Sequence, residues 1–159
     1  MPKPVLQAMV IADHVYQDRR SGKFVIAGTF GTIYLATRRL QPESGPSEMP
    51  SGRHLVSGPI SQMGSPFLYL ALTEVHGQIP LQLKFVDLAE AAVLFEAEFE
   101  VRAVDPVAVA EYSLPLLPLP VAKAGTFSLD LIYEGEILGS WRITVKKAPD
   151  PSGEAEIET

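Results

Sequence analysis

The chain contains no cysteine, which excludes disulfide bonds and thiolate chemistry and suits a reducing compartment. It also lacks an uninterrupted apolar run of about 18 residues, the length that a membrane-spanning helix needs. The apolar stretch near the start is interrupted by Gln7 and ends at Asp13 and His14, which favours a first strand over an export signal. These absences predict a soluble, cytoplasmic protein with no membrane partner.

Basic charge is scarce as well. Lys and Arg number 13 against 19 Asp and Glu, and the formal net charge at pH 7 is −6. Because nucleic-acid binding depends on clustered Lys and Arg side chains, we expect no nucleic-acid partner. The 159 residues are 47% hydrophobic, which is enough to bury a core within one domain. We predict a single domain over residues 1–147 and a flexible acidic tail over residues 148–159.

The dominant pattern in the chain is an alternation of apolar and polar residues with period two. It is clearest in VLFEAEFEVR, residues 93–102. Phe95, Ala97, Phe99 and Val101 alternate there with Glu96, Glu98, Glu100 and Arg102. Successive side chains of a strand point to opposite faces, so we predict a strand with one buried and one solvated face. We interpret the glutamate row as the solvated face rather than as a calcium site.

Related patterns between turn signals predict further strands along most of the chain. They cover residues 5–16, 23–35, 67–75, 79–88 and 107–114, and a last pair on either side of residues 134–136. We expect one hairpin through residues 18–22 and another, between 67–75 and 79–88, through residues 76–78. Many short strands with frequent turns predict an all-β fold, a two-sheet antiparallel β-sandwich of about eight strands.

The last hairpin permits a prediction of register. A two-residue turn would place Leu129 opposite Ser140, whereas a three-residue loop over residues 134–136 places Leu129 opposite Trp141. The second register also sets Phe127 opposite Ile143 and Tyr133 opposite Ile137. Because a slip of one residue would turn a whole strand over, we predict the three-residue loop.

Two segments do not follow the period. Residues 37–66 are rich in Pro, Gly and Ser, and we predict one long irregular loop there, either functional or disordered. Residues 114–120, LPLLPLP, carry three prolines that cannot pair within a central ladder. This segment is expected to run extended along a sheet edge or to cross between the sheets.

Candidate contact residues are basic. Arg19 and Arg20 lie in the first predicted turn, and Arg38, Arg39 and His54 lie in the long loop. Arginine forks suit anionic groups, so these residues are the predicted ligand or partner contacts. No phosphate-binding glycine motif, nucleophile elbow or paired-histidine spacing accompanies them. We therefore predict no catalytic residue, no metal site and no cofactor.

The predicted function is a non-enzymatic binding or assembly module. Residues 5–16, 23–35 and 67–75 are apolar on both faces, more than one sandwich is expected to bury. That excess favours a protein partner or self-association. The alternative is a small-molecule-binding or hydrolytic protein in which residues 37–66 act as a lid.

Three segments resemble a known family. Residues 12–31 hold a strand ending in Asp18, an SGK turn and the strand IAGTF. Residues 68–88 hold two strands, and residues 115–146 hold a Pro-rich crossing before Gly-Thr-Phe and the last hairpin. Together they resemble an uncharacterised bacterial family of small stand-alone β-sandwich proteins, immunoglobulin-like or C2-like in shape. The resemblance implies the fold. Because the family has no established activity, it implies no role for any single residue.

Overall fold

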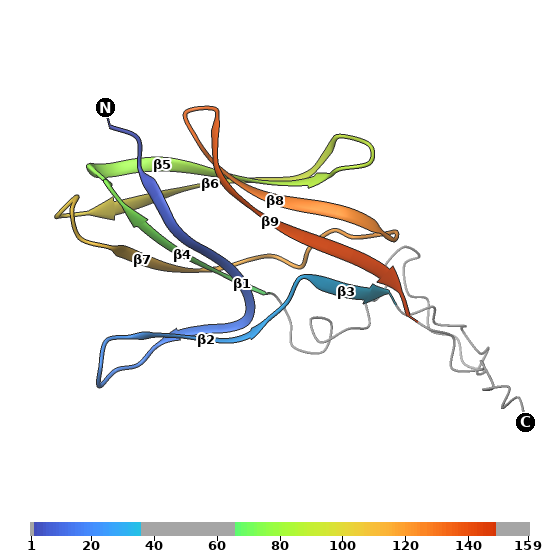
Figure 1. Cartoon of the computed structure of the whole chain (residues 1–159), viewed down its shortest axis with the longest axis horizontal. Helices are drawn as coiled ribbons and strands as arrows, with labels where there is room; N and C mark the ends of the chain where they lie inside the picture. Colours follow the sequence, from blue (N-terminus) through green and yellow to red (C-terminus); the bar gives the residue numbers. More distant parts are fainter. Residues whose placement is uncertain (1, 36–65, 149–159) are drawn as a thin grey trace, which may run out of the picture.

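The computed structural model describes residues 2–35 and 66–148, and within these ranges it contains strands and no helix. The strands form two sheets that pack together (Figure 1). One sheet has the order β2-β1-β4-β7 and comprises β1 (Val5–Gln17), β2 (Phe24–Thr29), β4 (Phe67–Thr73) and β7 (Ala110–Pro115). The other has the order β3-β9-β8-β5-β6 and comprises β3 (Thr32–Leu35), β5 (Gly77–Asp87), β6 (Ala92–Ala103), β8 (Gly125–Tyr133) and β9 (Glu136–Lys147). The all-β prediction is confirmed for the described residues; the predicted loop and tail lie outside them, apart from Pro66 and Ala148.

The prediction of purely antiparallel sheets is wrong at one edge, where β3 pairs with β9 in parallel. The cause is a break in residues 23–35, expected to be one strand. The chain leaves β2 at Phe30 and Gly31 and enters the other sheet. Two hydrogen bonds hold this crossing, from the Trp141 indole to the Phe30 carbonyl (3.0 Å) and from the Thr144 amide to the Gly31 carbonyl (2.8 Å).

The predicted hairpin between residues 67–75 and 79–88 does not form. β4 pairs with β1 and β7 in the four-stranded sheet, whereas β5 pairs with β6 and β8 in the other. Residues 74–76 carry the chain from one sheet to the other. The positive φ angles of Glu74 (57°) and Gly77 (72°) turn the backbone at this point. Glycine marked the turn correctly, but a turn residue does not specify which sheet the next strand joins.

The last hairpin keeps the predicted register away from the turn and loses it next to the turn. Leu129 faces Trp141 and Phe127 faces Ile143, as predicted, but Tyr133 faces Glu136, so the predicted pairing with Ile137 and the three-residue loop are wrong. The loop, however, has two residues, Glu134 and Gly135, both with positive φ, the geometry of a type I′ turn. A bulge between Leu131 and Ile132 absorbs the difference of one residue.

The main core lies between the two sheets. β4 contributes Leu68, Leu70 and Leu72, each fully buried. From the opposite sheet, Phe85 of β5 stacks on Phe127 of β8 with a ring-centroid distance of 5.4 Å. The prolines after β7 fall where predicted, in a segment that crosses between the sheets.

A second apolar cluster lies on the other face of the four-stranded sheet. Tyr69 and Ala71 alternate with the core leucines of β4 and are buried on that face. β1 curves strongly, so that its second half and β2 fold back over the sheet (Figure 1). The Phe24 ring lies 5.7 Å from that of Tyr69, and the Ser113 hydroxyl donates to the Val15 carbonyl (3.3 Å). The β1–β2 hairpin therefore covers apolar surface that the sequence alone assigned to a partner.

Candidate functional site

The predicted basic contacts divide into two groups. Arg19 and Arg20 lie together in the turn between β1 and β2, and both are exposed. Arg38, Arg39 and His54 lie outside the described residues. Exposed Lys23 adds a third cation to the turn, and none of the three forms an ion pair within residues 2–35 and 66–148. We call residues 18–23 the basic turn.

Hydrogen bonds fix the backbone of the basic turn. The Asp18 amide donates to the Lys23 carbonyl (2.8 Å), and the Gly22 amide donates to the Asp18 carbonyl (2.8 Å). The Asp18 carboxylate accepts from the Arg20 amide and the Ser21 hydroxyl, both at 2.9 Å. These two donors, the amide first, hold the pKa of Asp18 below its ordinary value of 3.8. Its carboxylate is thus engaged within the turn instead of pairing with an arginine.

A second feature was not anticipated from the sequence. The predicted strand over residues 107–114 begins later, at Ala110, so Val107 and Val109 belong to the connection between β6 and β7. We call residues 104–109 the valine connection. Val104 is 96% exposed, Val107 78% and Val109 57%. The Asp-Pro dipeptide at 105–106 is the turn signal that could have revealed it.

The valine connection is anchored at its base. The Glu74 amide donates to the Pro106 carbonyl at 2.7 Å, which ties the connection to the end of β4. The Val107 amide donates to the Asp105 carboxylate at 3.0 Å. The backbone of the valine connection is ordered before any ligand binds. Binding there therefore costs less conformational entropy than binding to a frayed loop, which must first become ordered.

The basic turn and the valine connection lie at the same end of the molecule, on the left of Figure 1. The fold-back of β1 brings the turn there. β7, which leaves the valine connection, contacts the hairpin through the Ser113–Val15 hydrogen bond. We call the two segments together the contact end.

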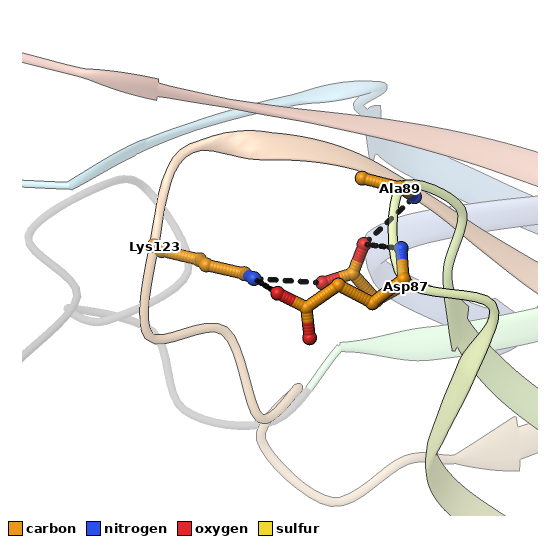
Figure 2. Close-up of polar contacts among 4 residues, drawn as sticks. Asp87, Ala89 and Lys123 are labelled. Atoms are coloured by element: carbon orange, nitrogen blue, oxygen red, sulfur yellow. Dashed lines mark hydrogen bonds and ion pairs between the residues drawn. The ribbon is translucent and has the colours of Figure 1, made fainter.

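A buried carboxylate forms a separate polar cluster. Asp87, at the end of β5, is 2% exposed, and its Oδ1 accepts from the Ala89 amide at 2.9 Å (Figure 2). Its Oδ2 lies 3.4 Å from the Lys123 ammonium, which also contacts Glu90. Burial alone would raise the pKa of Asp87, but the amides of Ala89 and Glu90 and the Lys123 charge outweigh it and keep the pKa low. The cluster joins the β5–β6 turn to the segment before β8, so we interpret it as a structural clamp.

Replacing Lys123 with methionine should lower the free energy of unfolding at neutral pH, since Asp87 and Glu90 lose their cation. The lowered pKa of Asp87 contributes stability above 3.8, which disappears as the pH falls through its folded value. The pKa of Lys123 is raised, chiefly by Glu90, so its contribution is complete below 10.5 and is lost as the pH rises further. Urea denaturation of both proteins should show the largest difference near pH 7, and a difference that is the same at pH 2.5, 7 and 11.5 would contradict the clamp.

Tyr69 contributes a neutral hydrogen bond rather than acid–base chemistry. Its hydroxyl donates to the Glu111 carboxylate across the β4–β7 pair. Burial, followed by the hydrogen bond and charge of Glu111, raises the pKa of Tyr69 to about 12. The phenol therefore stays protonated at neutral pH and serves to hold β4 and β7 together.

The other polar side chains are linked in small groups along the sheets; for example, Ser128 and Ser140 both donate to the Asp130 carboxylate. The glutamate row of β6 is exposed as predicted, and Gln78 and Gln82 of β5 donate to Glu100 and Glu96. Among the described residues, no group of three or more His, Asp or Glu side chains is placed to hold a metal ion.

In the described ranges, no helix has the length and apolar character needed to cross a bilayer. Comparison of the chain with protein-family models and with curated proteins finds no match. The predicted family resemblance therefore stays a prediction, and the chemistry of the contact end carries the functional conclusion.

Proposed function

We propose that this protein is a non-enzymatic binding module that contacts a protein partner through the contact end. The observation that carries the proposal is the exposure of Val104, Val107 and Val109 on one anchored connection. Apolar side chains on ordered loops of a rigid scaffold are a common recognition device. A partner would bury them and gain roughly 25 cal/mol for each Å² of apolar surface removed from water.

Two features of the fold indicate that the partner surface is not the second face of the two-sided apolar strands, where the sequence suggested it. The β1–β2 hairpin already covers the second face of β4, so that face is not available. The exposed apolar residues of the contact end lie in a connection instead of on a sheet. A second copy of the chain is one form that the partner could take, and light scattering of the purified protein distinguishes self-association from binding to another protein.

The test is a pull-down with the tagged full-length protein and the variant Val104→Asp/Val107→Asp, read by quantitative mass spectrometry. The double variant should recover at least tenfold less of a stoichiometric partner than wild type does, because two apolar contacts are replaced by charges. Leu117→Asp is the matched control, since Leu117 is also an exposed residue of a connection, at 68%. Equal recovery of the partner by the double variant and by wild type would refute the proposal.

We also propose the finer classification of fold and compartment. The two packed sheets, with one core between them, support a β-sandwich of immunoglobulin-like shape. The lack of cysteine supports the cytoplasm. The net charge of −6 supports a partner that is neither nucleic acid nor an anionic membrane.

A further inference from the structure

The basic turn presents an unusual set of side chains. Arg19, Arg20 and Lys23 are exposed, and Tyr16, two residues before the turn in sequence, is 56% exposed. Tyr16 faces solvent because its neighbour Val15 takes the inward side of the hairpin. Arginine and tyrosine are enriched among residues that dominate binding energies at protein interfaces.

We propose that the basic turn recognises an acidic peptide segment of the partner, one that carries carboxylates next to apolar side chains. This inference rests on the proposed function, since it names the partner chemistry of the same contact end. Arginine guanidinium groups bind carboxylates through paired hydrogen bonds. The valine connection at the same end supplies the apolar contacts.

The turn is prepared for this role by its own hydrogen bonds. Asp18 has both carboxylate oxygens engaged, by the Arg20 backbone amide and the Ser21 hydroxyl, and the Gln17 side-chain amide donates to the Gly22 carbonyl at 2.8 Å. The backbone that carries the cations is therefore ordered before a ligand arrives, which lowers the entropic cost of binding. No carboxylate within residues 2–35 and 66–148 forms an ion pair with Arg19, Arg20 or Lys23, so a ligand need not displace one.

The same observations disfavour a polyanion. Binding along a nucleic acid neutralises many phosphates at once, and a single turn offers three cations. The protein as a whole carries a formal charge of −6, which repels a long polyanion but permits a short acidic segment at a local basic site.

The experiment uses an array of 12-residue peptides in which the Glu and Leu contents vary independently. The labelled full-length protein should bind peptides rich in both residues and should bind Lys-Leu counterparts weakly. The variants Arg19→Glu/Arg20→Glu and Arg19→Gln/Arg20→Gln should each lose roughly tenfold or more in affinity for the acidic peptides. The wild-type affinity should also fall with rising salt, because the charges are exposed.

The matched control is Lys146→Glu/Lys147→Glu, which makes the same charge change in exposed residues at the far end of β9. It should change the affinity less than about threefold if the site is local. Equal losses in the β9 and turn variants would overturn the proposal, as would tighter binding of a single-stranded oligonucleotide or of vesicles containing phosphatidylserine. Acidic peptides that fail to bind, while Val104→Asp/Val107→Asp still loses the partner, would refute this inference and leave the proposed function standing.

Discussion

Replacing Phe85 with alanine is expected to lower the free energy of unfolding by about 3 to 5 kcal/mol. Phe85 is fully buried on β5, the strand between β8 and β6, and its ring stacks on Phe127 at 5.4 Å. The substitution removes the transfer free energy of the ring and leaves a cavity that the two packed sheets close only in part. Urea denaturation followed by tryptophan fluorescence measures the loss.

Leu117→Ala is the control for this prediction, because Leu117 is apolar and 68% exposed. Its effect should stay within about 0.5 kcal/mol. A loss below about 1 kcal/mol for Phe85→Ala would mean that the core does not lie where the two sheets face each other.

Gly28→Ala should lower the free energy of unfolding by about 2 to 3 kcal/mol. Gly28 has a φ of +74°, where an L-residue costs roughly 1 to 2 kcal/mol. A Cβ at this position would also lie 2.6 Å from Oδ2 and 3.1 Å from Cβ of Asp13; the carboxylate can rotate away, but the Asp13 Cβ must also shift, which adds a cost of about 1 kcal/mol. Thermal and urea denaturation should both report the change.

Gly22→Ala separates the two causes. Gly22 has a similar φ of +70°, but no atom lies within 4 Å of the Cβ that alanine would add. Its cost should therefore be the backbone strain alone, about 1 to 2 kcal/mol. Equal losses at the two glycines would show that the contact with Asp13 contributes nothing. The glycine of the IAGTF segment thus has a specific physical reason to be glycine.

The individual strands were predictable from period two, because burial of one face of a strand requires apolar and polar residues to alternate along it. β6 illustrates this: its glutamates are exposed and Val101 is buried, as the alternation indicated. The partners of β8 and β9 at Trp141 and Ile143 followed from the same reasoning, since only one register sets apolar residues opposite each other.

The arrangement of the strands was harder to predict, because it depends on contacts distant in sequence. Nothing local distinguishes the crossing at residues 74–76 from a hairpin turn. Gly28 and Gly31 mark an interruption near Phe30, but they do not indicate that the chain changes sheets there. The fold-back of β1 also depends on contacts distant in sequence. It buries Tyr69 under Phe24, so two-sided apolarity in β4 reflects a second layer from the same chain.

The contact end was only partly predictable, because the sequence shows where charges lie but not which apolar side chains are exposed. Arg19 and Arg20 were identified because charge in a predicted turn is visible in the sequence. The valines of the connection were assigned to a strand, since valine favours strands and exposure leaves no compositional mark. Their exposed fractions and the two hydrogen bonds at Pro106 and Asp105 reveal that an ordered backbone holds these side chains in solvent.

We propose that the contact end recognises a partner through its two segments. In this proposal the two sheets supply rigidity, the basic turn supplies charge complementarity, and the valine connection supplies apolar area. The clamp at Asp87 and Lys123 lies between the β5–β6 turn and the segment before β8, and we assign it no part in binding.

Site-specific photo-crosslinking in cells tests whether the contact end binds a partner. A photoreactive phenylalanine analogue is placed at Val107 in one protein and at Leu117 in another, both highly exposed positions. We expect a discrete crosslinked product from position 107 and none from position 117, and we expect the product from 107 to be lost when Arg19→Glu/Arg20→Glu is added. A product from position 117 with none from position 107 would show that the partner does not bind at the contact end.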